Sequence, residues 1–312
     1  CALPIYLDRS QKCNQTIITL SAHLRGYPCK ERIQEMGVVA KISQQTKLQN
    51  FTLLAPMALV TFLSDFGDMD YYVPAVKARM LSINPQLQIV DISHSIAAFD
   101  LEHAAFVLRA TFREFPKGTV HLVGINTTGT ATAGFIGIKL EDHIFIGPNN
   151  GILSMLADYD PGIIVQFADI HVKDSTFPTR DILAPIAAKV ASGAAIHDFG
   201  GPSSQFKKLM PRQAKATREQ IVGHVVRVDR YGNLITNIRR EVFEKLNPGK
   251  FTVQFGRETH RQLQTGYDQV EAGEPYLFFN SLDVLEIGIN HGHGGNLLGL
   301  KRDSVVYINF EP

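Results

Sequence analysis

The chain has 312 residues, of which 45% are hydrophobic and 20% are charged, a balance typical of folded globular proteins. Its formal net charge of +1 provides no field that would recruit nucleic acid or an anionic membrane surface. No apolar run reaches the roughly 18 residues that a transmembrane helix needs. We therefore expect neither a nucleic-acid partner nor a membrane partner.

The beginning of the chain differs from the remainder. All three cysteines, Cys1, Cys13 and Cys29, lie there, which excludes a disulfide framework or a Cys₄ zinc site from the body of the protein. Residues 1–56 show no sustained periodicity and lack the cationic start and apolar stretch of a secretory signal. We interpret this segment as an extension read in frame from upstream sequence, with translation starting at Met57, and we expect a cytoplasmic protein.

From Met57 onward, short apolar strands alternate with amphipathic helices. The expected order is strand, helix, strand, helix, strand over residues 58–63, 71–83, 87–92, 101–112 and 119–125. Asp100 is the expected N-cap of the second helix. Such alternation predicts a mostly parallel sheet covered by helices on both faces. Further strands at 138–140 and 143–146 and a helix at 182–191 complete an α/β domain over residues 57–203.

The second half of the chain has a different character. Residues 204–220 are polar and basic, and we interpret them as a solvated linker. Beyond Ile221, strand-like segments follow one another at short intervals, including two on either side of the turn Tyr231-Gly232-Asn233. This pattern predicts a small all-β domain, an antiparallel barrel or sandwich, over residues 221–312.

Polar side chains follow three of the predicted parallel strands. Asp65 follows the first strand, His94 the second and Asn126 the third. Because ligands bind at the carboxyl ends of strands in open α/β sheets, these loops are candidates for a binding site. A carboxylate at the position of Asp65 can accept hydrogen bonds from both hydroxyls of a ribose; the alternative is that Asp65 caps the following helix.

Other motifs give weak signals. Glycines at 124, 129 and 134 do not fit the G-x-G-x-x-G spacing, and no P-loop lysine lies near them. His291 and His293 lack a nearby third ligand, so we predict no metal site. His121 lies within a strand among apolar residues, and we interpret it as a hydrogen-bonded structural residue.

Six sequence blocks together carry a family resemblance. In order, they are "FLSDFGDMDYYVPAVKARMLSINPQLQIVDISHSI", "FPKGTVHL", "GPNNGI", "TFPTRDILAP", "DRYGNLITNI" and "LEIGIN". Their order and spacing resemble the family of S-adenosylmethionine (SAM) hydroxide adenosyltransferases and SAM-dependent chlorinases and fluorinases. The resemblance covers nearly all of residues 57–312.

The resemblance implies a homotrimer that binds SAM between the α/β domain of one subunit and the β domain of its neighbour, with no cofactor beyond SAM itself. It makes Asp65 the ribose-binding carboxylate. The other positions that match ligand contacts of the family are Phe99, Phe177, Thr179, Asp229, Tyr231, Asn233 and Ser281. The arginine that often follows the serine in the halogenases is Leu282 here.

The reaction that the resemblance implies is displacement of methionine from the ribose C5′ by water or a halide. The hydroxide-using members orient and deprotonate water with an Asp, an Arg and a His, and these positions read Asn126, Ala133 and Pro178 here. None of the three can act as a base. The candidate catalytic residues are therefore Asn126 itself, Thr128 and Thr179, which can hold a nucleophile by hydrogen bonds. The chain lacks the halogenases' Tyr-Pro-x-Thr motif, so we expect no fluorination.

Two main functional hypotheses remain open. The first is an enzyme that cleaves SAM to an adenosyl product and L-methionine with a rearranged nucleophile site. The second is a catalytically inactive SAM or adenosine sensor on the same fold. A purely structural trimer is the third and the least favoured, since most of the binding set is present.

Overall fold

The computed structural model describes residues 58–128, 134–167, 175–246 and 249–311. The interpretation of residues 1–56 as an extension, with a start at Met57, lies outside the described residues. Ala133, one of the three positions that replace the family's water-activating residues, also lies outside them.

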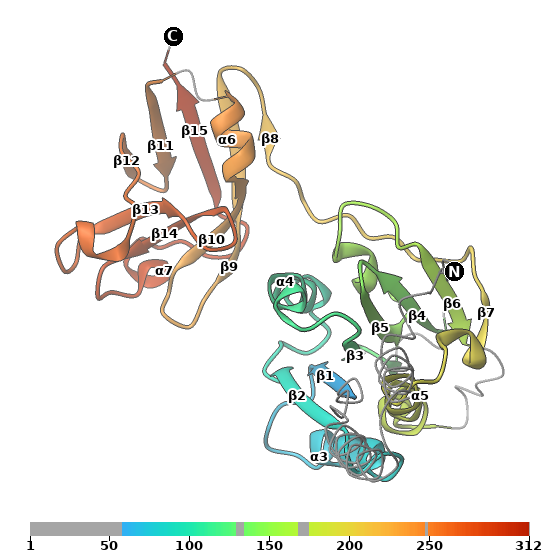
Figure 1. The fold of residues 1–312 in the computed structure, drawn as a ribbon. Helices are drawn as coiled ribbons and strands as arrows, with labels where there is room; N and C mark the ends of the chain where they lie inside the picture. Colours follow the sequence, from blue (N-terminus) through green and yellow to red (C-terminus); the bar gives the residue numbers. More distant parts are fainter. Residues whose placement is uncertain (1–57, 129–133, 168–174, 247–248, 312) are drawn as a thin grey trace, which may run out of the picture. The chain divides into compact units, whose positions relative to one another are not determined.

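The first half of the described chain forms a seven-stranded sheet in the order β2-β1-β3-β5-β4-β6-β7 (Figure 1). The strands are β1 (Leu59–Ser64), β2 (Gln88–Ser93), β3 (Val120–Gly124), β4 (Phe135–Leu140), β5 (His143–Pro148), β6 (Ile163–Phe167) and β7 (Gly200–Pro202). The first three strands are those expected from the alternating pattern. The short β6 and β7 were not predicted.

The prediction of a mostly parallel sheet is only partly confirmed. Pairs β1–β2, β1–β3 and β3–β5 are parallel, whereas β4–β5, β4–β6 and β6–β7 are antiparallel. The physical reason is the short connection between β4 and β5, which consists of Glu141 and Asp142. Two residues can join only antiparallel neighbours, because a parallel pair needs a long crossover. Glu141 adopts a positive φ of 53° in this turn. The sheet is therefore mixed.

Helices cover both faces of this sheet. Helices α3 (Tyr72–Leu81) and α5 (Ala184–Ala191) pack on the face that Phe62 points to, and α4 (Leu101–Thr111) packs on the opposite face with Leu63. Successive residues of a strand point to opposite faces, so a continuous apolar run such as β1 supplies both cores. The predicted cap of α4 is confirmed, because the Asp100 side chain accepts a hydrogen bond from His103 N at 3.0 Å.

The second half forms a curled, wholly antiparallel sheet that makes a half-barrel (Figure 1). Strands pair in the order β12-β11-β15-β9-β10-β14-β13, and β8 pairs with β9. Their bounds are β8 (Lys215–Ala216), β9 (Gln220–Val228), β10 (Leu234–Arg239), β11 (Phe251–Phe255), β12 (Glu258–His260), β13 (Pro275–Phe279), β14 (Val284–Ile289) and β15 (Val305–Phe310). The predicted all-β class holds; two short helices that were not predicted, α6 (Arg240–Leu246) and α7 (Gly294–Leu297), accompany the strands.

The core of the half-barrel is apolar and continuous across its strands. Buried side chains from β9, β10, β11, β13, β14 and β15 form one cluster, against which Phe243 of α6 packs. In the part of the chain that the structure describes, no helix is long and apolar enough to cross a membrane.

Candidate functional site

Asp65 lies directly after β1, where it joins three loops of the sheet. Its Oδ2 accepts hydrogen bonds from Phe99 N at 2.9 Å and Asn126 N at 3.4 Å. Both donors adopt positive φ angles, 66° for Phe99 and 49° for Asn126, a conformation that is uncommon outside glycine. The carboxylate therefore binds the loops that follow β2 and β3 to the loop that follows β1.

The alternative interpretation of Asp65 as a helix cap is wrong. Helix α3 begins after Tyr71, which makes no side-chain capping hydrogen bond. Among the described residues, no group donates a hydrogen bond to Asp65 Oδ1, so one carboxylate oxygen is available to a ligand. Phe99, whose backbone N–H donates to Asp65, is 65% exposed.

The residues that the sequence nominated for the nucleophile, Asn126, Thr128 and Thr179, differ in burial. Thr179 Oγ1 donates to Thr127 Oγ1 at 3.2 Å, and both side chains are buried. Thr128 is exposed, whereas Asn126 is half-buried. The loop after β3 and the start of the π-helical turn η7 (Thr179–Leu183) thus meet through two hydroxyls.

Gly124 permits the close approach of Thr179 to the end of β3. A Cβ at Gly124, the last residue of β3, would lie 3.0 Å from Thr179 Cγ2, which is tighter than nearly all real contacts. Phe177 and Pro178 precede Thr179 and direct the chain into η7. Phe177 is buried in an edge-on aromatic cluster with Phe66 and Tyr72, and the Arg180 guanidinium lies 5.3 Å from its ring centre.

Three polar side chains lie in series at this end of the sheet: Ser64 and His94 are buried, whereas the Asp91 side chain is 38% exposed. Ser64 Oγ lies 2.7 Å from His94 Nδ1, and His94 Nε2 lies 3.1 Å from Asp91 Oδ1. Burial alone would raise the pKa of Asp91, but hydrogen bonds from Lys77 and His94 lower it below its ordinary value. Although serine, histidine and aspartate here resemble a hydrolytic triad, Ser64 is completely buried and cannot reach a substrate.

In the β half, Asp229, Tyr231 and Asn233 form one tight turn between β9 and β10. Asp229 Oδ1 accepts hydrogen bonds from Tyr231 N at 2.9 Å and Asn233 N at 2.8 Å, and Oδ2 accepts one from Asn233 Nδ2 at 3.1 Å. Gly232 has a φ of 90°, and a Cβ there would overlap His293. The turn presents Tyr231, which is 79% exposed, and retains Asn233, which is buried.

Asn233 continues into a buried network that the sequence analysis missed. Its Oδ1 accepts a hydrogen bond from Tyr276 Oη at 2.7 Å. Behind Tyr276 lies Glu286, which is 4% exposed and accepts hydrogen bonds from Tyr267 Oη at 3.2 Å and Asn280 Nδ2 at 2.9 Å. The available signal was the single carboxylate in the otherwise apolar strand "VLEIGI".

Ser281 lies on a second turn, between β13 and β14. Asn280 Oδ1 accepts a hydrogen bond from Leu282 N at 2.9 Å, which closes this turn and leaves Ser281 exposed. Leu282, at the position of the halogenase arginine, is 40% exposed. The structure thus brings Asp229, Tyr231 and Asn233 together, and it connects them to Asn280 beside Ser281 through Glu286.

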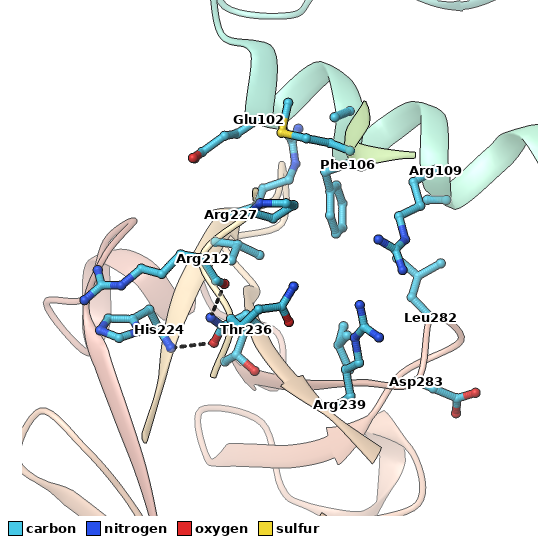
Figure 2. Close-up of a pocket in the computed structure, with 18 of the residues that line it drawn as sticks. Glu102, Phe106, Arg109, Arg212, His224, Arg227, Thr236, Arg239, Leu282 and Asp283 are labelled. Atoms are coloured by element: carbon cyan, nitrogen blue, oxygen red, sulfur yellow. Dashed lines mark hydrogen bonds between the residues drawn. The ribbon is translucent and has the colours of Figure 1, made fainter. Parts of the chain in front are cut away.

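A separate cleft of about 1100 Å³ lies between α4 and the strands β9 and β10 (Figure 2). Figure 2 shows Phe106 and Arg109 of α4 directed toward the side where Arg227 and Arg239 lie. Arg109 and Arg239 both donate hydrogen bonds to Asp158. These bonds, of which the one from Arg239 has the larger effect, hold the pKa of Asp158 well below its usual range. None of the site residues predicted from sequence lines this cleft.

His121 and His293, which the sequence analysis considered, both have structural partners. His121 Nδ1 lies 2.7 Å from Thr61 Oγ1, and His121 Nε2 lies 3.1 Å from His143 Nδ1. His293 Nδ1 accepts a hydrogen bond from Asn296 N at 3.2 Å at the start of α7. Within residues 58–311, apart from the three undescribed gaps, no group of three or more His, Cys, Asp or Glu side chains could hold a metal ion.

Comparison with known proteins gives matches over both halves of the chain. Residues 60–200 match the model of the SAM hydroxide adenosyltransferase N-terminal domain, and residues 223–307 match that of the C-terminal domain. A Thermus thermophilus protein named (R)-S-adenosyl-L-methionine hydrolase is 31% identical over 264 residues, which cover 81% of this chain and 100% of the relative. An Actinoplanes protein named fluorinase is 27% identical over 74% of this chain and 91% of its own length.

Two solved structures also align with most of this chain. The crystal structure of an uncharacterized conserved protein from Thermotoga maritima aligns with a TM-score of 0.73 at 30% identity, and the alignment covers 80% of this chain and 99% of that one. The crystal structure of a conserved hypothetical protein from Thermus thermophilus aligns with a TM-score of 0.64 at 29% identity, over 81% of this chain and 100% of that one.

Proposed function

Because this chain belongs to the SAM hydroxide adenosyltransferase family, we propose that it is an enzyme that cleaves SAM at the ribose C5′. A nucleophile attacks C5′ in line with the sulfonium, the C5′–S bond breaks, and its electron pair leaves on the sulfur of L-methionine. With water as nucleophile, the products are adenosine, L-methionine and a proton. The similarity to the (R)-S-adenosyl-L-methionine hydrolase from Thermus thermophilus supports hydrolysis over halogenation for this chain.

The observation that carries the proposal is the arrangement of Asp65. Its Oδ2 is held by two backbone donors, and its Oδ1 receives no hydrogen bond from a described residue. A carboxylate positioned in this way accepts hydrogen bonds from ribose hydroxyls without reorganisation. The exposed ring of Phe99 then lies beside the nucleoside, and Phe177 and Thr179 contribute the opposite loop.

The nucleophile in this proposal is positioned by neutral groups. The half-buried Asn126 and the hydroxyl of Thr179 can orient a water by hydrogen bonds, and Thr128 adds a hydroxyl at the exposed edge. Since the leaving group is a neutral thioether from a cationic sulfonium, the reaction needs a well-placed, desolvated water more than a strong base.

We further infer that the site is shared between subunits of a homotrimer. Two aromatic side chains at candidate ligand positions, Phe99 and Tyr231, are 65% and 79% exposed. Exposed aromatic side chains at the edge of a site are typical of surfaces that a ligand or a second subunit covers. In this arrangement the Tyr231 turn and Ser281 of one subunit face the Asp65 loop of another.

Incubation of the full chain with SAM in H₂¹⁸O tests the function directly. Hydrolysis gives equal amounts of adenosine and L-methionine, with the label in the adenosine 5′-hydroxyl. A 5′-chloro product in the presence of chloride would replace water by halide as the nucleophile. Tight binding of SAM in calorimetry without any product would establish the inactive sensor instead.

A further inference from the structure

Glu286 connects the two turns of the β half that carry candidate ligand residues. On one side, Tyr276 Oη lies between Glu286 Oε1, at 3.4 Å, and Asn233 Oδ1, at 2.7 Å. On the other side, Glu286 Oε2 accepts the Asn280 Nδ2 hydrogen bond at 2.9 Å. A single buried carboxylate therefore accepts a hydrogen bond directly from Asn280, beside Ser281, and contacts the Asp229–Asn233 turn through Tyr276, whose one phenolic proton points to Asn233 at 2.7 Å.

The donors to Glu286 are all neutral. Tyr267, Tyr276 and Asn280 surround it, and no described lysine, arginine or histidine forms an ion pair with Glu286 or Asp229. Burial raises the pKa values of both tyrosines, and the charges of Glu286 and Asp229 raise them further. The phenols stay protonated and act as donors, so they do not neutralise the carboxylates.

A cation bound at this site would offset the cost of burying the Glu286 carboxylate. A buried carboxylate is ordinarily paired with a positive partner, because desolvation of an unpaired charge is unfavourable. Neutral donors stabilise Glu286 by hydrogen bonds but leave its negative potential in place, in surroundings where charges interact more strongly than in water. The negative charges of Glu286 and Asp229 therefore lie behind the two turns that carry Tyr231 and Ser281, where Arg227 interacts with Asp229 and Arg240 pairs with Asp283.

We propose that Glu286 is a specificity-determining and positioning residue that selects a cationic nucleoside over a neutral one at this site. The inference rests on the proposed function, since SAM carries a sulfonium and an ammonium group against a single carboxylate. Glu286 acts through the Tyr276–Asn233 and Asn280 contacts and through its charge, without itself touching the ligand. The charge of Glu286 favours the binding of SAM and does not change the binding of adenosine, which is neutral.

The variant Glu286→Gln removes the negative charge of the side chain and keeps its size and shape. Glutamine can accept the Asn280 hydrogen bond with its carbonyl oxygen and donate its two amide hydrogens to Tyr267 Oη and Tyr276 Oη, and Tyr276 still donates to Asn233, so both turns are retained. The matched control is Glu274→Gln, which removes the same charge from an exposed side chain of the same half. Glu286→Ala would remove the connection as well as the charge.

The affinities of the full chain and both variants are measured by calorimetry for two ligands. One is sinefungin, in which an ammonium replaces the sulfonium so that cleavage cannot occur, and the other is adenosine. For Glu286→Gln we expect sinefungin binding to weaken by about tenfold, the effect of one charge at intermediate dielectric, with adenosine binding unchanged. Glu274→Gln should change neither affinity.

Three outcomes overturn the inference. Equal losses for both ligands in Glu286→Gln would mean that the residue is only structural, and unchanged affinities would mean that its charge is not sensed. A similar loss for sinefungin in Glu274→Gln would make the effect one of net charge. Failure of the unmutated chain to bind either ligand would instead refute the proposed function, which keeps the two failures distinct.

Discussion

At the scale of single residues, the proposed ribose contact of Asp65 gives a direct prediction about binding. In the proposed site, substitution of Asp65 by alanine removes one partner of a charge-assisted hydrogen bond to the nucleoside, and it also frees the backbone donors Phe99 N and Asn126 N. We expect adenosine affinity to fall by about 1–3 kcal/mol, measured by calorimetry. Asp70→Ala, a change at an exposed aspartate nearby, is the control. Equal affinities for Asp65→Ala and the unmutated chain would refute the ribose role of Asp65.

His121 makes a second residue-scale prediction, on acid stability. Burial, with a smaller effect of His143, lowers its pKa from 6.5 to about 3. Between these two pH values the unfolded chain binds a proton that the folded chain excludes. The stability contribution of neutral His121 is thus fully present above pH 6.5 and is lost as pH falls toward 3, by up to about 1.4 kcal/mol per pH unit.

The measurement is the melting temperature between pH 7 and pH 4 for the unmutated chain and for His121→Gln. Glutamine retains a hydrogen-bonding group toward Thr61 but cannot be protonated, so its melting temperature should fall less steeply with acid. His197→Gln, a change at an exposed histidine, should follow the unmutated curve. Parallel curves for all three proteins would show that His121 does not limit acid stability.

At the scale of elements, the start of α4 offers a test of local stability. Asp100 caps the helix through His103 N and also pairs with Arg302 at 2.7 Å. We expect Asp100→Ala to lower the free energy of unfolding by about 1 kcal/mol, the usual value of an N-cap. Asp100→Asn retains a capping oxygen and loses only the charge, so denaturant titration should show a smaller loss. A loss as large for Asn as for Ala would assign the effect to the ion pair.

The elements also show where interpretation of the sequence succeeded and where it failed. Strands β1, β2 and β3 and helices α3 and α4 were predicted, because continuous apolar runs, helical spacing, Asn84-Pro85 and the Asp100 cap are local signals. The direction of β4 was missed, although its two-residue connection to β5 already required antiparallel pairing. Strand β7, with sequence Gly-Gly-Pro, has no strand propensity and exists through its pairing with β6.

At the scale of the whole molecule, the inferred trimer makes a prediction about mixed subunits. Asp65→Ala and Tyr231→Ala should each reduce SAM cleavage, because each damages one half of a shared site. Subunits of the two variants, unfolded together and refolded, should regain activity, since about one quarter of the sites in random trimers join two intact halves. Activity no higher than that of either variant alone would place both halves within one subunit.

The sequence by itself determined the family, the two structural classes along the chain and the positions of the candidate ligand residues. These properties are carried by local patterns and ordered motifs such as "SDFGD" and "DRYGNLITNI", which can be read without a structure. Asn126 and Pro178 were also evident as departures from the water-activating residues of the family. Their consequence for chemistry is still a prediction.

Only the tertiary structure decided which polar groups act together. The Phe99 and Asn126 contacts to Asp65 depend on positive φ angles in two loops, and Glu286 joins residues from two separate turns. Hydrogen-bond partners between residues tens of positions apart are set by packing, so no local pattern encodes them. The sequence could therefore name Asp229, Asn233 and Ser281, but the buried carboxylate that connects their turns emerged only once the strands were paired.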